Sequence, residues 1–306
     1  MCAIYGFLDY GKKINHRVLN KLVKEMSIAA EYRGTDATGI SYVNDGQIVT
    51  YKKAKPAHKV KLYFPKGTTA LIGHNRMTTQ GNERYNFNNH PFEGETDKHS
   101  FALAHNGILR NDKTLRKNEK LPFTHIETDS YIAVQLLEQL NKVDAEDLKE
   151  VAEKVEGSFV FTVLRDDNTL YLVKGDNPIT LLHFPDLGLY LYASTAEILK
   201  SAMKFARFRE PFENIMVSTG DIVEIDREGN ISMSDFKCAY VMSYYDRYIC
   251  EIEEQENLLL SICGMYGVNP DDVELLLEFG YSCDEIEEMM ADSRIMEVVL
   301  KELKAV

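Results

Sequence analysis

The chain opens with Met1-Cys2-Ala3-Ile4-Tyr5-Gly6-Phe7, an apolar stretch that is typical of a buried strand and begins beside a cysteine. Removal of the initiator methionine would give Cys2 both a thiol and a free α-amine. The α-amine titrates near ~8 in model peptides and the thiol near ~8.5, so the amine can accept the thiol proton directly or through a water. The stretch is thus either an ordinary core strand or the site of a nucleophile with its own base.

The size and charge of the chain argue against a membrane-spanning or nucleic-acid-binding protein. The 306 residues can bury a full core, and no apolar run approaches the ~20 residues of a membrane helix. Residues 251–306 hold 15 acidic and 3 basic residues; subtracted from totals of 48 and 35, this leaves 33 acidic and 32 basic residues in 1–250. A nearly neutral body with an acidic tail offers no basic face for nucleic acid.

The five cysteines are scattered along the chain and form no CxxC pair. This pattern predicts no metal site and no disulfide framework, and we expect no cofactor. No signal-peptide pattern follows Met1. We therefore expect a reduced, cytoplasmic protein that binds neither nucleic acid nor a membrane. The cysteines are Cys2, Cys238, Cys250, Cys263 and Cys283.

Residues 2–236 have the pattern of one domain that is rich in strands. Because the strands do not alternate regularly with helices, the pattern predicts antiparallel sheets with helices layered outside. The segment 77–98 reads as a long irregular loop. Strands are expected at 2–8, 39–43, 47–52, 72–76, 101–105, 158–165, 169–174, 179–183, 188–193, 214–218, 221–225 and 230–235, and helices at 15–31, 128–140, 144–155 and 195–206.

Three local signals refine this pattern. Asn106-Gly107 is ordinarily a type I′ turn that ends a strand. Ser194-x-x-Glu197 is typical of a capping box. One of Thr128, Asp129 and Ser130 is expected to cap the helix that follows.

Residues 246–306 have helical periodicity with Gly and Pro breakers, and we expect a small, acidic α-helical module there. The module could dock a partner, form a homo-oligomer contact or be a solvated appendage. Helices are expected at 258–265, 271–279, 282–291 and 294–304. The expected core consists of Leu275, Leu276, Phe279, Ile286, Met289 and Met290.

An N-terminal thiol that attacks a carboxamide needs oxyanion donors and charged anchors for the substrate. The Asn106 amide and the Gly107 N–H could converge on one oxygen. Arg76 could bind an α-carboxylate and Asp129 an α-ammonium group. Each residue also has an ordinary explanation, as a turn, a surface arginine or a helix cap.

In order and context, these pieces resemble the glutaminase domain of class II glutamine amidotransferases, which are N-terminal nucleophile hydrolases. The resemblance covers roughly residues 2–235. The matching segments are Cys2-Ala3-Ile4-Tyr5-Gly6, Arg33 to Gly39, His74 to Gly81, Asn88 to Pro91, His105-Asn106-Gly107 with Asn111, Thr128-Asp129, and Glu156-Gly157-Ser158.

The resemblance implies a four-layer αββα sandwich of two antiparallel sheets and an enzyme that releases ammonia from glutamine. It gives Cys2 the role of nucleophile and amine base, and Asn106 and Gly107 the role of oxyanion hole. Arg33 matches an arginine that supports the catalytic site, which completes the expected catalytic set.

By the same resemblance, Arg76 would bind the glutamine carboxylate and Asp129 its ammonium group. Thr79 matches a residue near the substrate, and His90 is expected to line the pocket or orient its loop. The pattern differs from the family at Ala3, Met77, Gln80 and Tyr131. None of the expected roles falls on these four positions.

Family members pass ammonia to an acceptor-binding domain. Because ~70 residues follow the body, too few for such a domain, we expect a stand-alone glutaminase with a separate synthase or acceptor subunit. Two alternatives are a hydrolase of another γ-glutamyl amide and a non-catalytic protein that senses glutamine. The acceptor, the natural amide and the oligomeric state stay undetermined at this point.

Overall fold

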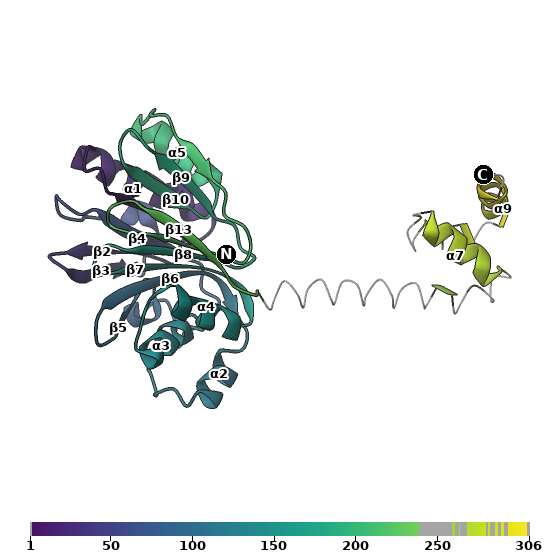
Figure 1. Ribbon diagram of the computed structural model, residues 1–306, viewed down its shortest axis with the longest axis horizontal. Coiled ribbons are helices and arrows are strands. Elements are labelled where there is room, and N and C mark those ends of the chain that lie inside the picture. Colours follow the sequence, from purple (N-terminus) through teal and green to yellow (C-terminus); the bar gives the residue numbers. More distant parts are fainter. Residues whose placement is uncertain are drawn as a thin grey trace. The chain divides into compact units, whose positions relative to one another are not determined.

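The computed structural model describes residues 2–238 and, in the C-terminal part, 259–260, 263, 268–279, 281, 285–286, 289–290 and 293–304. The chain divides into two compact units, Met1–Val241 and Met242–Val306 (Figure 1). This division falls between the expected segments 2–236 and 246–306. Cys250, Cys283 and the expected breakers Gly264, Gly267 and Gly280 lie outside the described residues.

Cys2 lies at the start of the central strand of a seven-stranded antiparallel sheet. Strand β1 runs between β10 and β4, with Tyr5 opposite Ala193 and Ala3 opposite Asn75. The strand order is β11-β9-β10-β1-β4-β2-β3. The bounds are β1 Ala3–Asp9, β2 Ala37–Asn44, β3 Gln47–Lys53, β4 Ala70–Arg76, β9 Thr180–Phe184, β10 Leu189–Ala193 and β11 Glu213–Ile215.

The second sheet has six antiparallel strands in the order β13-β12-β8-β7-β6-β5. Its strand β6 carries Asn106 and Gly107 and pairs along its length with β7. The bounds are β5 Phe92–Glu95, β6 Ser100–Leu109, β7 Gly157–Arg165, β8 Leu170–Lys174, β12 Asp221–Ile225 and β13 Ile231–Asp235.

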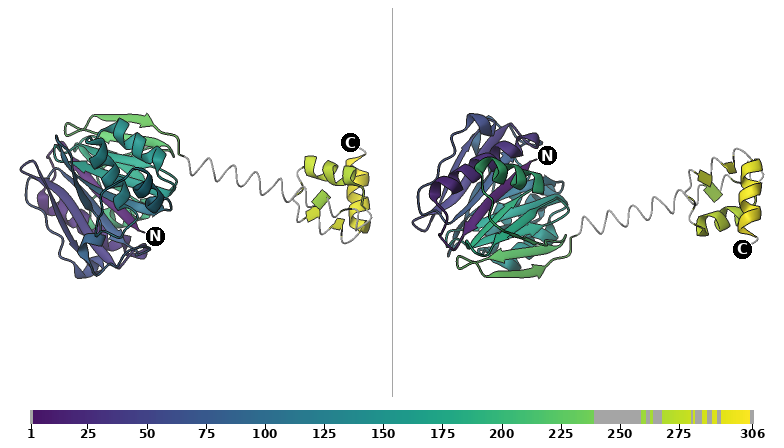
Figure 2. Two further views of the ribbon diagram at one scale, coloured as in Figure 1. Left: turned by 90° about the horizontal axis from the view of Figure 1, so that it is seen from below. Right: turned by 90° about the horizontal axis from the view of Figure 1, so that it is seen from above.

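The helices of the first unit lie on the outer faces of the two sheets (Figure 2). Apolar residues of α1 and α5 pack on the seven-stranded sheet, and those of α2, α3 and α4 pack on the six-stranded sheet. The bounds are α1 His16–Ala29, α2 Asp112–Asn118, α3 Tyr131–Leu140, α4 Ala145–Lys154 and α5 Ala196–Ala206, with short 3-10 turns η1 Ala30–Tyr32, η2 Ala57–Lys59 and η3 Asn86–Asn88.

A third apolar cluster fills the space between the sheets. It joins Ile4 and Ile72 of one sheet to Ala102, Ala104 and Val160 of the other. Two sheets that share an inner core and carry helices outside form four layers, so the expected αββα sandwich is confirmed. The layers bring the start of β1 and the end of β6 to the same interior region.

Several local predictions were wrong. Strand β6 does not turn at Asn106-Gly107 but continues to Leu109, because β7 pairs with it through Gly157. The interval 77–98, expected to be irregular, contains β5, and the helix α2 was not expected.

The capping box at Ser194 was also wrong. Its hydroxyl oxygen accepts a hydrogen bond from Ile4 N–H at 2.9 Å and so ties β1 to the end of β10. The N-cap of α5 is Thr195, and neither this residue nor Ser130, the N-cap of α3, makes a side-chain capping bond.

The described residues of the second unit include α7 (Pro270–Glu278) and α9 (Ser293–Leu303). Asn269 caps α7 through its side chain, as expected for Asn before Pro at a helix start. Leu276, Ile286, Met289 and Met290 are buried as predicted. Phe279 is 52% exposed, so its predicted place in the core was wrong.

Candidate active site

Cys2 sits in a buried niche between β1 and the segment after β4. Met77 N–H donates to Cys2 Sγ at 3.4 Å, and the Sγ lies 3.5 Å from Met77 O. Arg33 Nε donates to Cys2 O at 2.8 Å, which fixes the backbone of the cysteine. Burial raises the pKa of the Cys2 thiol, while the Met77 N–H and the charge of Arg76 act to lower it.

Asn106 is one of the buried residues whose side-chain polar atoms are left without partners. Its side chain is fully buried, and neither Nδ2 nor Oδ1 has a hydrogen-bond partner among the described residues. Leaving a buried polar group unpaired typically costs about 1–3 kcal/mol. An amide that is unpaired in the free protein is ready to bind a ligand that supplies the missing partner.

Gly107 follows with backbone geometry that excludes a side chain. Its φ is 150°, and a Cβ at this position would lie 1.9 Å from Ser158 O. Phe159 is the residue opposite Gly107. Its backbone groups point toward the β8 side of β7 and not toward β6, because its N–H donates to Asp176 Oδ1 and its C=O accepts from Gly175 N–H.

Backbone groups in an antiparallel strand alternate between its two neighbours, so Gly107 N–H also points away from β7. On that side β5 pairs with the Ser100–Leu103 part of β6 and not with its end. The Gly107 N–H is therefore directed away from the sheet pairing, next to the unpaired Asn106 side chain.

Arg76 contrasts with Asn106, because the protein already satisfies its guanidinium. The residue is 2% exposed. Its Nη1 donates to Asn89 Oδ1 at 2.7 Å, and its Nη2 donates to Gln80 O, with Gly81 O and Thr128 Oγ1 both at 3.4 Å. Burial lowers the pKa of Arg76, and the charges of Cys2, Glu83, Asp129 and Asp36 oppose this effect. The alternative explanation of Arg76 as a surface arginine is therefore wrong.

Asp129 is 2% exposed and does not cap α3. Its Oδ2 accepts from Leu109 N–H at 2.7 Å, and its Oδ1 accepts from Ser130 Oγ at 3.3 Å. The carboxylate therefore faces the end of β6. Its charge acts to raise the pKa of the Cys2 thiol, whereas the charge of Arg76 acts to lower it.

Three buried imidazoles, those of His74, His90 and His105, form a cluster near these residues, and the His105 ring packs on Phe161 on the α3 side of the second sheet, where its Nδ1 lies 2.7 Å from Ser130 Oγ. His74 Nε2 donates to His105 O at 2.9 Å and so joins β4 to β6. The His90 ring is tilted by 39° against that of His74 with ring centres 4.1 Å apart, and neither of its ring nitrogens has a partner among the described residues. Burial lowers the pKa of all three, that of His74 to about 3, so the rings are neutral near pH 7.

Two predicted residues stand apart from the groups that face Cys2. Thr79 is exposed on the segment after β4, and His90 belongs to the imidazole cluster. Sequence reasoning missed Asn89, which holds Arg76, and Asn177, whose Nδ2 donates to Asn106 O at 2.9 Å. Asn89 lies inside a quoted motif, but Asn177 is 71 positions from its partner and carries no local signal.

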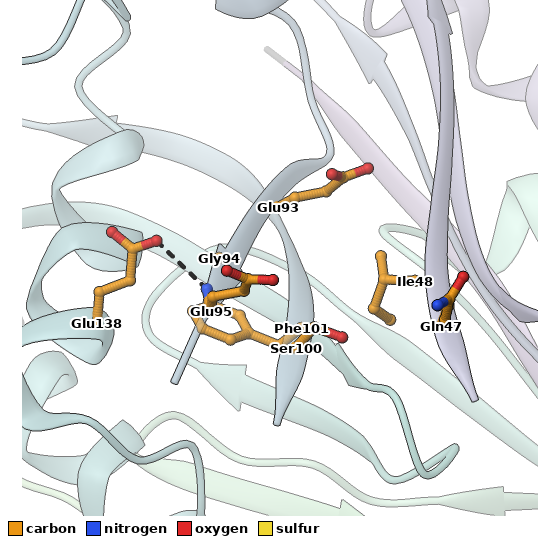
Figure 3. Close-up of a pocket in the computed structure, with 8 residues that line it drawn as sticks. All are labelled: Gln47, Ile48, Glu93, Gly94, Glu95, Ser100, Phe101 and Glu138. Atoms are coloured by element: carbon orange, nitrogen blue, oxygen red, sulfur yellow. Dashed lines mark hydrogen bonds between the residues drawn. The ribbon is translucent and has the colours of Figure 1, made fainter. Parts of the chain in front are cut away.

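A separate cavity of about 420 Å³ lies beside β5, and Figure 3 shows its lining. Glu93 and Glu95 of β5 and Glu138 of α3 surround it, and Glu95 N–H donates to a Glu138 carboxylate oxygen at 3.3 Å. It shares no lining residue with the site around Cys2. Among the described residues, no group of three or more His, Cys, Asp or Glu side chains could hold a metal ion.

No helix in the described part of the chain is long and apolar enough to cross a membrane. Residues 34–235 match the model of the family described as class-II glutamine amidotransferases. Two solved structures share the fold: glutamine phosphoribosylpyrophosphate amidotransferase from B. subtilis, with a TM-score of 0.60, and the allosteric regulatory enzyme of purine biosynthesis, with 0.62. Both are under 20% identical, and the match covers 78% of this chain and 50% of each of theirs.

Curated relatives extend the comparison to sequence. Glutamine–fructose-6-phosphate aminotransferase from Staphylococcus epidermidis is 30% identical over 286 residues, and that from Staphylococcus aureus 27% over 288. Each match covers 87% of this chain and 45% of the relative, so the chain spans about half the length of these proteins. A family match over 34–235, this identity and the αββα sandwich together place the chain among the class-II glutamine amidotransferases.

Proposed function

We propose that this protein hydrolyses the side-chain amide of glutamine through a thioester on Cys2. The observation that carries the proposal is the buried Asn106 amide, which has no partner among the described residues and adjoins a Gly107 N–H directed away from the sheet. Two such donors are what the oxyanion of a tetrahedral intermediate requires. Membership of an amidotransferase family supplies the class of substrate.

In the first step, the α-amine of Cys2, freed by removal of Met1, takes the thiol proton. The sulfur then forms a bond to the δ-carbon of glutamine, and the carbonyl oxygen becomes an oxyanion that accepts from Asn106 Nδ2 and Gly107 N–H. The C–N bond breaks as the protonated amine returns its proton to the leaving nitrogen. Ammonia leaves, and a γ-glutamyl thioester remains.

In the second step, water attacks the thioester and passes a proton to the same α-amine. The oxyanion forms again in the same place, the C–S bond breaks, and glutamate and the thiol are released. The raised pKa of the thiol keeps it protonated until a base is present, so the adjacent amine is needed to accept the thiol proton.

Selectivity would come from charges at the two ends of the amino acid. We propose that Asp129 receives the α-ammonium group and Arg76 the α-carboxylate, with Thr79 near the substrate, and that Arg33 holds Cys2 through its carbonyl. Because Arg76 already donates to Asn89 and Gln80, its role requires the remaining N–H groups or a shift of the segment after β4. His90 would line the pocket or orient its loop.

The ammonia acceptor is the finer part of the proposal. The names of the curated relatives couple glutamine to fructose 6-phosphate, and this chain spans 45% of their length. We propose that the acceptor binds to a separate partner subunit, which receives ammonia from this chain. The second unit, 246–306 in the proposed division, is the candidate for docking that partner.

Ammonia release from glutamine by purified protein tests the amidase. We expect Cys2→Ala to lower the rate by at least about 10³-fold, because it removes the nucleophile. Cys263→Ala is the matched control: this cysteine is also buried, but it lies in the second unit, so its rate should equal that of the wild type. Equal rates for wild type and Cys2→Ala would contradict the proposal.

Covalent labelling by an electrophilic glutamine analogue separates an enzyme from a glutamine sensor. An enzyme becomes labelled on Cys2, whereas a sensor binds the analogue without reacting. Intact mass gives a further requirement, since the base exists only if Met1 has been removed. An active protein that fully retains Met1 would contradict the mechanism.

A further inference from the structure

We infer that Asn177 is a positioning residue for this amidase: it fixes the peptide unit between Asn106 and Gly107 and thereby aims the Gly107 N–H at the reacting carbonyl. The inference rests on the proposed function. Asn177 is outside every motif that carries the family resemblance, and it lies in the loop between β8 and β9.

The contact is buried and short. Asn177 is 8% exposed, and its Nδ2 donates to Asn106 O at 2.9 Å. The loop itself is held in place, because Lys174 Nζ donates to Asn177 O at 3.0 Å and to Gly175 O at 3.3 Å. Asn177 thus reaches the end of β6 from a fixed support.

The same loop is joined to β7 directly opposite Gly107. Asp176 Oδ1 accepts from Phe159 N–H at 3.0 Å, and Gly175 N–H donates to Phe159 O at 3.1 Å. Phe159 is the registered partner of Gly107. The loop that supplies Asn177 is therefore positioned by the very residue that faces Gly107 across the sheet.

Peptide planarity turns this contact into control of the donor. The Asn106 C=O and the Gly107 N–H belong to one planar trans unit, so they point in opposite directions. The Asn106 carbonyl lies on the β7 side of β6, where Val160 is the registered partner of Asn106, and the bond from Asn177 adds a second restraint on the same oxygen; both hold the Gly107 N–H on the side of β6 that β5 does not cover. Rotation of this unit would turn the donor away from the oxyanion.

Control is needed here because Gly107 limits rotation less than other residues do. Glycine has no Cβ to restrict its backbone, and a φ of 150° is a conformation that other residues rarely adopt. Loss of one oxyanion donor typically lowers kcat by about 10²–10³-fold. Misdirecting the donor should cost part of this, about 10- to 100-fold.

The test uses the full chain with two variants. Asn177→Leu removes the donor at similar volume, and Asn177→Asp keeps the shape but presents an acceptor to the Asn106 carbonyl. We expect each to lower kcat for glutamine by about 10- to 100-fold, with KM and the inhibition constant of glutamate within about two-fold of wild type. Should Asn177→Leu fail to fold, Asn177→Asp carries the measurement.

Gln135→Leu is the matched control, because Gln135 is a buried amide on α3 whose Nε2 donates to a backbone carbonyl, that of Pro122, at 2.7 Å. It should lower the melting temperature about as much as Asn177→Leu but leave kcat unchanged. Unchanged kcat in both Asn177 variants of an active enzyme would overturn the inference and leave the proposed function standing. Absence of amidase activity in the wild type would overturn both.

Discussion

Two polar groups of the site, the Arg76 guanidinium and the Asn106 amide, are buried to the same degree but differ in their hydrogen bonds. Arg76 donates to Asn89, Gln80 and neighbouring acceptors. Both polar atoms of Asn106 lack partners among the described residues. A satisfied group maintains the shape of a site, whereas an unsatisfied group stores binding capacity for a ligand, so we expect substitutions at the two places to have different consequences.

Asn106→Ala should give the largest effect on catalysis and little on stability. It removes an oxyanion donor, so we expect kcat to fall by about 10²–10³-fold. Since the amide makes no hydrogen bond in the free protein, the free energy of unfolding should change by less than about 1 kcal/mol. Steady-state kinetics and urea denaturation measure the two. A large loss of stability with normal kcat would reverse the comparison.

Asn89→Ala should show the opposite balance. It leaves Nη1 of a buried arginine without its acceptor, and we expect the free energy of unfolding to fall by about 1–3 kcal/mol. KM for glutamine should rise more than kcat falls, because Arg76 binds substrate in our proposal. Asn230→Ala, at an exposed asparagine, is the control and should change stability by less than about 0.5 kcal/mol.

The three buried imidazoles predict a dependence of stability on pH. Their folded-state pKa values lie below the ~6.5 of an unfolded histidine, that of His74 at about 3. Between these values the unfolded chain binds more protons, so stability is complete above pH ~6.5 and falls as the pH drops toward 3. His74 should contribute about 1.4 kcal/mol per pH unit in this window, and His90 and His105 act in the same direction.

Urea denaturation at pH 7.5, 6.0 and 5.0 checks this dependence. His90→Phe removes one of the three groups and should reduce the slope by about one proton. His125→Gln, at an exposed histidine, should leave the slope unchanged. A slope that is equal in all three proteins would exclude the imidazole cluster as its source.

Deletion of 246–306 should have the smallest effect on catalysis, because Asn106 and Arg76 both lie in the first unit. We expect kcat for glutamine to stay within about two-fold of the full chain, as is usual for independent domains. Size-exclusion chromatography and pull-down test the docking role of the deleted module. If oligomer size and bound partners are unchanged, the module does not dock them.

The sequence alone was enough to predict the layered fold, and the roles of the residues around Cys2 stay predictions. Alternating apolar strands and amphipathic helices have local signatures, and the order of the motifs indicated the family and its four-layer sandwich. The Asn-Gly pair misled because its turn preference is local, whereas β6 continues through it under pairing with β7. Ser194 misled for the same reason, since a distant strand uses its hydroxyl.

Partners that are distant in the chain could not be predicted in this way. Nothing near Asn177 indicates a bond to Asn106, because the contact depends on how the loop between β8 and β9 packs against β6 across β7. Nor could the sequence distinguish the satisfied Arg76 from the unsatisfied Asn106. Hydrogen-bond saturation is a property of the whole neighbourhood and appears only when all the groups are in place.

The bond from His74 to the carbonyl of His105 crosses from one sheet to the other. His74 lies two positions before Arg76, and His105 lies one position before Asn106. The bond between them therefore restrains the distance between Arg76 and Asn106. A small displacement of one sheet relative to the other would move Arg76 and Asn106 relative to each other, and with them the groups that bind the two ends of glutamine in our proposal. The neutral His74 ring thus has a structural role in joining the two sheets, whether or not it takes part in the chemistry.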